Sequence, residues 1–301
     1  MIDISDKIET KRTAVAESRV QAKDETIRRI VAGDTPKGDV LNIARAAALL
    51  AAKKTPELIP HCHPLAIDKI DVRFEPDKTE IRILVEVRTL GRTGVEMEVL
   101  TAAMVAALTI YDMAKGIDKE IIIGETKLIG KRGGKSDYIE EFLQPIRGAV
   151  LVTSDSVAAG KKSDKSGRII VEAMEAFPVN VEHYEILPDD QAAIHEKIMG
   201  WIEEGIQLVL TTGGTGFGPR DVTVEAVSKI IEREAPGIAE AMRAYGQRRT
   251  PYAMLSRSVV GLHGKTLLIT LPGSSNGVKE SLAAIFPNVL HTFNMLQGGG
   301  H

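Results

Sequence analysis

The 301-residue sequence has a single cysteine, Cys62, which excludes an internal disulfide framework and suits a reducing compartment. It also lacks a charge excess. Its 38 basic and 41 acidic residues leave a net charge of −3, which gives no electrostatic reason to bind nucleic acid or an anionic membrane. The opening stretch MIDISDKIETKR holds no apolar signal core, and no apolar run approaches the roughly 20 residues that span a bilayer. We therefore expect a cytoplasmic protein without nucleic-acid or membrane partners.

The chain changes character near residue 145. A glycine-rich and then acidic stretch ends at Pro145, and the apolar run GAVLVTS (148–154) begins soon after it. Such a run is typical of the buried first strand of a parallel sheet. With 44% hydrophobic residues, the chain has enough apolar mass for sizeable cores. We predict two domains, 1–145 and 146–301, joined by a linker at about 137–147.

The first half mixes helical and strand patterns. Residues 9–33 are polar with spaced apolar positions, which predicts a mostly helical segment. Further patterns predict helices at 41–59 and 99–116, a hairpin at 68–90 and a strand at 119–129. Together these elements predict an α+β domain with helices packed on an antiparallel sheet.

The second half alternates strands with helices. Helices are predicted at 167–177, 191–205 and 279–293, and strands at 181–187, 207–216 and 265–277, the last two running into glycine loops. Strands that end in glycine loops ahead of helices indicate an α/β domain with a mostly parallel sheet. Its ligand crevice is expected at the C-terminal ends of the strands.

The glycine loops carry the clearest chemical signal of the second half. TTGGTGFGPRDVT (211–223) spaces its glycines so that backbone N–H groups can approach a phosphate, and it does not match a Walker motif. Asp221 either holds a divalent cation at the end of this loop or caps the following helix, and spacing favours neither reading. Asp189 and Asp190 follow another predicted strand, and they too could cap the helix that begins after them. A second loop, LPGSSNG (271–277), is expected at the same edge of the sheet.

Candidate groups in the first half are scattered along the chain. Lys37 lies on a Pro/Gly turn, and GKRGGKS (130–136) is a basic glycine loop. Asp112 and Lys115 share one face of an apolar helix because they are three residues apart. An ionic pair at the end of a buried helix is more typical of a functional site than of a surface pair.

PHCHPLAI (60–67) leaves two readings open. If the segment is extended, His61 and His63 point to one side and form a metal site that Glu96 and Glu98 complete, as in a metal-dependent hydrolase. Otherwise the stretch belongs to a substrate pocket.

These motifs together resemble two known families. KGDV, HCHPL, TGVEMEVLTAA, TIYDMAKG and GGKS follow the order seen in the MoaC family of cyclic pyranopterin monophosphate synthases, over about residues 1–138. LVTSDS, LPDD, TTGGTGFGPRDVT, LSRS and LPGSS resemble the MoaB/MogA family of molybdopterin-binding domains, over about 147–301. Both resemblances lead to molybdenum cofactor biosynthesis. They imply a ferredoxin-like first domain and a three-layer α/β second domain.

The resemblance to MoaC implies that the first domain converts 3′,8-cyclo-7,8-dihydro-GTP to cyclic pyranopterin monophosphate and pyrophosphate. It implies an acid/base pair, Asp112 and Lys115, and it favours the pocket reading of His63 over a metal site. The implied site comprises Lys37, His63, Glu98, Asp112 and Lys115 as catalytic residues, Arg12, Lys37 and Lys131 at the triphosphate, and Cys62, His63, Met97 and Glu98 on the pterin side.

The resemblance to MoaB/MogA implies that the second domain adenylylates molybdopterin with Mg-ATP, without a prosthetic group. The alternative is a pterin-binding module without catalysis. The implied site comprises Asp189 and Asp221 as catalytic, Mg²⁺-linked carboxylates, Gly213, Gly214, Thr215 and Gly216 around the phosphates, and Ser154, Asp155, Pro272, Gly273 and Ser274 in the rest of the pocket.

The resemblances also imply an assembly. The resemblance to MoaC implies a hexamer built from three dimers, with active sites at the subunit interfaces. The resemblance to MogA implies a trimer. Three-fold symmetry is common to both, so we expect a homo-oligomer, a hexamer. Its expected partners are small molecules: the cyclised GTP intermediate, molybdopterin and ATP.

Overall fold

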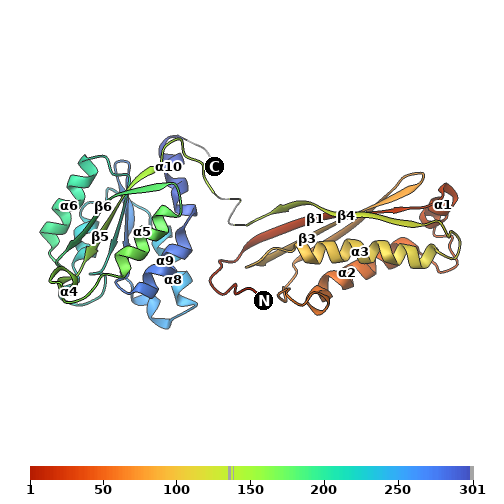
Figure 1. Cartoon of the computed structure of the whole chain (residues 1–301), viewed down its shortest axis with the longest axis horizontal. Helices are drawn as coiled ribbons and strands as arrows, with labels where there is room; N and C mark the ends of the chain where they lie inside the picture. The colour runs from red at the N-terminus through yellow and green to blue at the C-terminus, as the bar shows by residue number, and fades with distance from the viewer. Residues whose placement is uncertain (135–136, 138, 299–301) are drawn as a thin grey trace. The chain divides into compact units, whose positions relative to one another are not determined.

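A computed structural model describes residues 1–134, 137 and 139–298 (Figure 1). The chain divides into two compact units, Met1–Asp137 and Tyr138–His301. Lys135 and Ser136, the end of the GGKS motif, lie outside the described residues, as do residue 138 of the predicted linker and residues 299–301. Glu140 of that linker bonds within the second unit, where it accepts from His291 Nδ1 at 2.6 Å. The functional boundary at 145/146 stays a prediction.

The first unit is an antiparallel sheet in the order β2-β3-β1-β4, with α2 and α3 on one face (Figure 1). Its elements are β1 (Thr10–Gln21), α1 (Asp24–Ala32), α2 (Val40–Leu58), β2 (Lys69–Pro76), β3 (Glu80–Gly91), α3 (Glu96–Ala114) and β4 (Ile122–Arg132). The helices, hairpin and strand predicted after residue 40 all form, with ends that differ by up to three residues. The predicted antiparallel sheet is confirmed.

The prediction of a mostly helical 9–33 is wrong for its first half. Thr10–Gln21 is strand β1, which pairs with β3 on one side and β4 on the other. Ala14, Ala16, Ser18 and Val20 are buried at a spacing of two. Small and polar side chains make this alternation a weak sequence signal, and pairing with two neighbouring strands decides the conformation.

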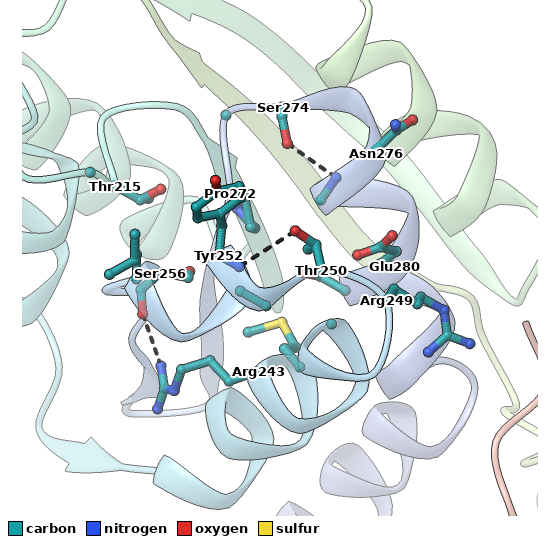
Figure 2. Close-up of a pocket in the computed structure, with 18 residues that line it drawn as sticks. Thr215, Arg243, Arg249, Thr250, Tyr252, Ser256, Pro272, Ser274, Asn276 and Glu280 are labelled. Atoms are coloured by element: carbon teal, nitrogen blue, oxygen red, sulfur yellow. Dashed lines mark hydrogen bonds between the residues drawn. The ribbon is translucent and has the colours of Figure 1, made fainter.

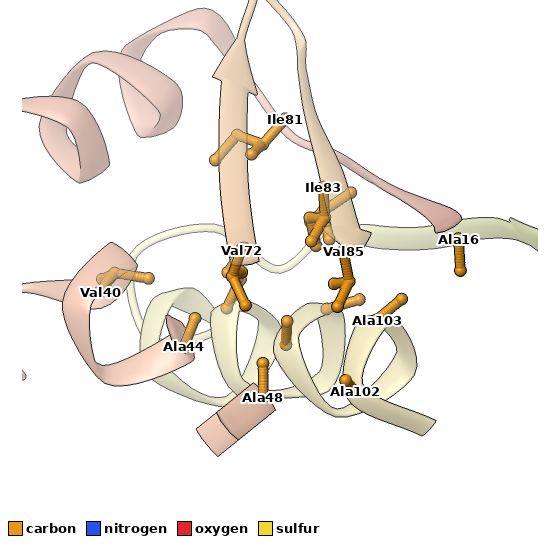
Figure 3. Packing of buried hydrophobic residues seen from close by; sticks show 14 of the residues in the cluster. Ala16, Val40, Ala44, Ala48, Val72, Ile81, Ile83, Val85, Ala102 and Ala103 are labelled. Carbon is orange, nitrogen blue, oxygen red and sulfur yellow. The ribbon is translucent and has the colours of Figure 1, made fainter. Parts of the chain in front are cut away.

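The core of the first unit joins sheet side chains to alanine faces of the two long helices. Figure 3 shows the buried residues that meet there: Ile81, Ile83 and Val85 from β3, Ala44 and Ala48 from α2, and Ala102 and Ala103 from α3. Because alanine is small, the helices can pack closely on each other and on the sheet. The core therefore fixes α3 along its length.

Helix α3 has the length and composition of a membrane-spanning helix, with a mean hydropathy of 1.4. However, 56% of its apolar window is buried inside the first unit. The helix thus has the burial expected of the core helix of a soluble protein.

The second unit is built on a six-stranded sheet in the order β6-β5-β7-β10-β9-β8. Its elements are β5 (Ile146–Thr153), α4 (Asp155–Ala158), α5 (Ser166–Glu175), β6 (Val179–Leu187), α6 (Gln191–Glu203), β7 (Leu208–Thr212), α7 (Thr223–Ser228), β8 (Arg233–Glu234), α8 (Pro236–Gln247), η2 (Pro251–Leu255), β9 (Val260–His263), β10 (Thr266–Leu271), α9 (Ser275–Ile285), η3 (Asn288–Leu290) and α10 (His291–Leu296). The first four strands of the sheet are parallel, and β9 pairs antiparallel with β10 and β8. The predicted mostly parallel sheet is confirmed.

Helices cover both faces of this sheet (Figure 1). Residues of α5, α8 and α9 pack in one apolar cluster, and residues of α6 and α7 pack in another. The helix predicted at 279–293 is interrupted, because α9 ends at Ile285 and Pro287 follows. Proline has no N–H for the helix and disfavours helical geometry in the residue before it.

Candidate functional site

Asp112, near the end of α3, bonds two lysine side chains. Lys115 Nζ lies 2.7 Å from Asp112 Oδ1. Lys37 Nζ donates to Asp112 Oδ2 at 2.8 Å and to its carbonyl oxygen at 2.9 Å. Lys37 stands on the turn before α2, and Asp39 caps that helix by accepting from Asn42 N at 3.0 Å. We name Lys37, Asp112 and Lys115 the Asp112 cluster.

The Asp112 cluster is exposed and carries a net positive charge. Hydrogen bonds from Lys115 and Lys37 lower the pKa of Asp112 to about 2. The same contact with Asp112 raises the pKa of Lys115. At neutral pH the cluster is therefore a carboxylate between two ammonium groups, and Lys115 holds the transferable proton. Exposed ion pairs add little stability, so this arrangement is better suited to binding an anion and donating a proton.

A second set of predicted residues meets at the other end of α3. Glu98 is 3% exposed. Burial raises the pKa of the Cys62 thiol, and the charge of Glu98 nearby adds to that rise. Lys131 Nζ on β4 lies 3.5 Å from Glu96 Oε1, and Arg12 lines the same cavity of about 90 Å³. We name Arg12, Cys62, Glu98 and Lys131 the Glu98 cluster.

Glu98 is a buried carboxyl in the first turn of α3. Burial raises its pKa above the ordinary 4.5, and the charge of Glu96 adds to the rise, while its own backbone N–H opposes it. No ion pair of Glu98 is found among the described residues. Met97 beside it is 40% exposed. Burying a carboxylate without a cation costs stability, which is typical of a group kept for contact with a ligand.

The HCHP stretch lies in the loop between α2 and β2 and is not a strand. His63 is partly buried. His61 is exposed. In the part of the chain that the structure describes, no group of three or more His, Cys, Asp or Glu side chains is placed to hold a metal ion. The reading of His61, His63 and Glu98 as a metal site therefore has no preformed ligand set.

Helix α3 keeps the two clusters of the first unit apart. Glu98 and Asp112 are 14 positions apart in this helix. At 1.5 Å per residue, their Cα atoms are about 21 Å apart along its axis. The residues predicted to form one site thus fall into two groups, and each group presents lysine or arginine side chains.

Three strand ends of the second unit meet, as predicted, at one edge of the sheet. The Thr153 hydroxyl donates to Thr212 O at 3.2 Å, and the Thr212 hydroxyl donates to Pro272 O at 2.7 Å. Gly213 has a φ of 98°, and a Cβ there would lie 2.0 Å from Thr153 O. Only glycine allows the backbones to approach so closely in this conformation. The loops after β5, β7 and β10 therefore adjoin.

Asp189 and Asp155 are joined by reciprocal backbone hydrogen bonds. Asp155 N donates to Asp189 Oδ2 at 3.0 Å, and Asp189 N donates to Asp155 Oδ1 at 3.1 Å. Arg220 donates two hydrogen bonds to the Asp155 carboxylate, at 2.9 and 3.0 Å. Asp190 caps α6 by accepting from Ala193 N. The capping role thus belongs to Asp190, and Asp189 faces the glycine loop instead.

One oxygen of Asp189 is buried without a hydrogen bond. Asp189 Oδ1 has no partner among the described residues, and a Cβ added at Gly214 would lie 3.2 Å from it. Burial raises the pKa of Asp189 above 3.8, and the carboxylates of Asp155 and Asp221 add to the rise. A buried oxygen of this kind is costly to leave unpaired. It is the type of ligand that a Mg²⁺ bound mainly by phosphates would use.

Asp221 does not cap a helix, so that reading is wrong. Helix α7 begins at Thr223 without a side-chain cap. Asp221 Oδ2 instead accepts from Gly218 N at 2.8 Å and closes a turn of the glycine loop. A Cβ at Gly216 would lie 3.0 Å from the same oxygen. The carboxylate therefore belongs to the loop that is suited to phosphate.

A cavity of about 620 Å³ adjoins these loops and extends between α8, η2 and α9 (Figure 2). From the predicted site, it is lined by Thr215, Gly216, Pro272, Gly273 and Ser274. The described lining residues do not include Asp189 or Asp221. Ser274 also caps α9, as Ser154 caps α4.

Sequence reasoning missed the far side of this cavity, which includes Arg243, Thr250, Tyr252 and Glu280. Most of these residues come from α8, η2 and α9, away from the strand ends that carry the glycine loops. The LSRS motif was the one signal that pointed there, because Ser256 lines the cavity.

Arg257 of the LSRS motif holds the glycine loop at two points. Its Nε donates to Gly216 O at 2.7 Å, and its Nη2 donates to Asp221 O at 3.0 Å. Its Nη1 also pairs with Glu225 on α7. One guanidinium thus connects the start and the end of the segment that carries Asp221, with a planar set of donors that lysine lacks.

Two family models match the chain. The model described as "MoaC family" matches residues 1–134. The model described as "Probable molybdopterin binding domain" matches residues 149–292.

Similar curated proteins cover the whole chain or its first half. A "Molybdenum cofactor biosynthesis bifunctional protein" of Chlorobaculum tepidum is 43% identical over 301 residues, which are 100% of this chain and 96% of that protein. A protein with the same name from Synechococcus elongatus is 37% identical over 100% of this chain and 98% of its own length. A "Cyclic pyranopterin monophosphate synthase" of Brevibacillus brevis is 56% identical over 45% of this chain and 86% of its own length.

We predict that Glu98→Gln makes the protein more stable at neutral pH. The pKa of Glu98 is raised in the folded chain, so the fold disfavours the charged form and loses stability as pH rises through 4.5. Glutamine removes this loss. Thermal unfolding should therefore give a higher Tm for the variant at pH 7, with the gain disappearing below pH 4.5. Glu25→Gln, at an exposed position of α1, is the control. A lower Tm at pH 7 would contradict the prediction.

We predict that Arg257→Lys loosens the glycine loop. Lysine keeps the charge but cannot reach Gly216 O and Asp221 O together. At about 1 kcal/mol for the hydrogen bond that lysine cannot keep, amide hydrogens of residues 213–221 should exchange roughly 5-fold faster. Hydrogen-exchange mass spectrometry measures this rate. Arg243→Lys is the matched control, because Arg243 bonds Ser258 O outside the loop. An unchanged exchange rate in the Arg257 variant would show that the loop keeps its conformation without these hydrogen bonds, which would contradict the prediction.

Proposed function

Because the chain belongs to the family of molybdenum cofactor biosynthesis bifunctional proteins, we propose that its two domains are two enzymes, a cyclic pyranopterin monophosphate synthase and a molybdopterin adenylyltransferase. The first activity is supported by the Asp112 cluster. The second is supported by the buried unpaired oxygen of Asp189 beside the glycine loop. The first domain is also proposed to have the ferredoxin-like fold. The strand order β2-β3-β1-β4 supports this proposal, as does a β-α-β-β-α-β order of elements to which one further helix is added, since α1 and α2 both lie between β1 and β2.

In the first domain, Lys115 donates protons and Asp112 holds it in the charged form. The substrate, 3′,8-cyclo-7,8-dihydro-GTP, must open a ring, close a cyclic phosphate and release pyrophosphate. Each of these steps moves protons, and Lys115 is protonated because the Asp112 carboxylate lies 2.7 Å from its Nζ. Lys37 adds a second ammonium group at the same point. The sequence predicted that Asp112 and Lys115 act together as an acid/base pair. In this proposal Lys115 is the proton donor, and the Asp112 carboxylate orients it.

The Glu98 cluster binds the rest of the substrate. Arg12 and Lys131 line one small cavity together with Arg132, and these cations suit the triphosphate and the departing pyrophosphate. Glu98 and Cys62 face the pterin side with Met97 and His63. The raised pKa of the buried Glu98 carboxyl favours hydrogen bonding to a polar ring.

The two clusters meet on one substrate when a second copy of the chain supplies one of them. About 21 Å separates Glu98 from Asp112 along α3. Met104, Leu108 and Tyr111 form an exposed apolar stripe on this helix, 48%, 57% and 36% exposed. An apolar stripe of this kind is typical of a contact with another subunit. The proposed assembly is a homo-oligomer with three-fold symmetry, a hexamer.

We predict that two inactive variants restore each other. Asp112→Asn and Lys131→Ala should each lower cyclic pyranopterin monophosphate formation by about 100-fold or more. After co-expression, random pairing should recover about a quarter of the parent activity, because mixed pairs hold one intact site. Asp112→Asn co-expressed with Lys115→Ala is the control and should stay inactive.

If the co-expressed variants recover no activity although light scattering shows that they form oligomers, the whole site belongs to one chain. A clean monomer in light scattering would exclude the proposed assembly.

In the second domain, the glycine loop and two aspartates promote attack of the terminal phosphate of molybdopterin on the α-phosphorus of ATP. Backbone N–H groups at Gly213, Gly214 and Gly216 approach the phosphates. Asp189 Oδ1 and Asp221 are the carboxylates proposed to hold Mg²⁺, and they fit it as a minor share of a set completed by phosphates and water. Bound Mg²⁺ offsets the charge of the phosphates and of the leaving pyrophosphate.

A second candidate is that this domain binds the pterin without catalysis. One observation favours it: the cavity of about 620 Å³ is formed without Asp189 or Asp221 among its described lining residues. A domain could hold a pterin in this cavity whether or not it adenylylates the phosphate.

We predict that Asp221→Asn abolishes adenylylation and keeps pterin binding. The parent with molybdopterin and Mg-ATP should release pyrophosphate and form adenylylated pterin, and the variant should be at least about 100-fold slower. Asp190→Asn is the control, because Asp190 caps α6. A folded parent that binds molybdopterin but forms no product would establish the second candidate instead.

The remaining proposals follow from the two reactions. The substrates are the cyclised GTP intermediate, molybdopterin and ATP, and Mg²⁺ accompanies ATP without any prosthetic group. The compartment proposed from the sequence is the cytoplasm, and neither nucleic acid nor a membrane is a proposed partner.

A further inference from the structure

Glu280 is a carboxylate without a partner inside the large cavity. It stands on α9, is partly buried, and is the one acidic side chain among the described residues that line the cavity. Within the described chain it has no hydrogen bond or ion pair with another residue. An acidic group left in this state inside a cavity is available to a ligand.

The arginines of the cavity are engaged elsewhere. Arg243 Nη1 donates to Ser258 O at 3.0 Å. Arg249 stacks on the Tyr245 ring at 3.4 Å and donates to Tyr245 O at 2.9 Å. Neither arginine therefore neutralises Glu280 in the described structure.

Gly246 of α8 adjoins the carboxylate and lines the same cavity. A Cβ added at Gly246 would lie 3.8 Å from Glu280 Oε2 but only 2.8 Å from Ala253 Cβ, so glycine here lets η2 pack closely against α8. Asn276 stands four residues before Glu280 on α9 and lines the same cavity. A flat polar ring edge placed here would meet a carboxylate and an amide.

The two sides of the cavity differ in chemistry. Figure 2 shows Glu280 and Asn276 on one side, with Thr215 and Ser256 on the other. The side at Thr215 belongs to the glycine loop, whose N–H groups suit phosphate. The side at Glu280 offers hydrogen-bond acceptors and therefore suits a ligand edge that carries N–H donors.

We propose that Glu280 binds the 2-amino-4-oxopyrimidine edge of the pterin and so sets which ligand enters this end and how it is oriented. This inference rests on the function proposed above for the second domain. N3–H and the 2-amino group lie side by side and donate to the two carboxylate oxygens, in the manner of a guanidinium. Adenine presents an amino donor beside a ring-nitrogen acceptor, so one lone pair would face the carboxylate. Glu280 thus selects the pterin over adenine and directs the pterin phosphate toward the glycine loop.

The test compares two small probes on the full chain by isothermal titration. One probe is 6-hydroxymethylpterin, and the other is 6-hydroxymethyl-lumazine, in which an oxo group replaces the 2-amino group. The parent should bind the pterin about 10- to 100-fold more tightly than the lumazine. Glu280→Gln keeps the size of the side chain and should lose that preference, mainly through weaker pterin binding. Glu280→Asp keeps the charge and should fall between the two.

Glu240→Gln is the matched control, because Glu240 is an exposed residue of α8 outside the cavity lining. Emission of Trp201, which is buried in the second unit, checks that each variant is folded. Parent-like pterin preference in folded Glu280→Gln overturns the inference and leaves the proposed function standing. A parent that neither binds the pterin nor adenylylates molybdopterin overturns both.

Discussion

The straight, closely packed helix α3 is the constraint on which the first domain depends. Its alanines pack against the sheet and α2 along its length, so its two ends cannot approach each other. Glu98 stands at one end and Asp112 at the other. In the proposed reaction the substrate contacts both groups. One chain alone cannot place both at the same substrate, because the rigid helix keeps them about 21 Å apart. In the proposed assembly, the exposed apolar stripe of Met104, Leu108 and Tyr111 is the contact through which a second copy of the chain would bring the other set of residues within reach.

In the second domain, the topology of the sheet brings the proposed site residues together. Parallel strands joined by crossover helices place all their C-terminal ends at one edge of the sheet. The loops after β5, β7 and β10 consequently adjoin within one chain, and hydroxyl groups of Thr153 and Thr212 join them. In the antiparallel sheet of the first domain, neighbouring strands end at opposite edges. The connections of each sheet therefore explain why the loops of the second domain adjoin, whereas the residue clusters of the first domain lie apart.

The sequence predicted most elements because their patterns are local. The hairpin at 68–90 alternates clearly, and the long helices are rich in alanine and leucine. β1 could not be predicted in the same way, since Ala14 and Ala16 carry little apolar signal and the strand is stabilised by both of its neighbours. The end of α9 before Pro287 has a local signal, because proline disfavours helical geometry in the residue before it.

The site was predictable only where a motif and a local contact coincide. The Asp112 and Lys115 pair follows from their spacing in a helix. The choice between Asp189 and Asp190 as a cap needed hydrogen-bond partners that spacing does not give. The far side of the cavity needed the packing of α8 against α9, which joins residues about 30 positions apart and leaves no periodic signal in the sequence.

The two candidate functions of the second domain differ in which residues they require. Pterin binding uses the cavity between α8, η2 and α9, whereas adenylylation also needs the carboxylates of Asp189 and Asp221 beside the glycine loop. These two carboxylates lie outside the described cavity lining, so other residues form the cavity walls. An enzyme and a binding module can therefore have the same fold and the same cavity. The unpaired Asp189 Oδ1 favours the enzyme here. A buried oxygen without a partner destabilises the fold, and a bound cation that pairs with it would offset that cost.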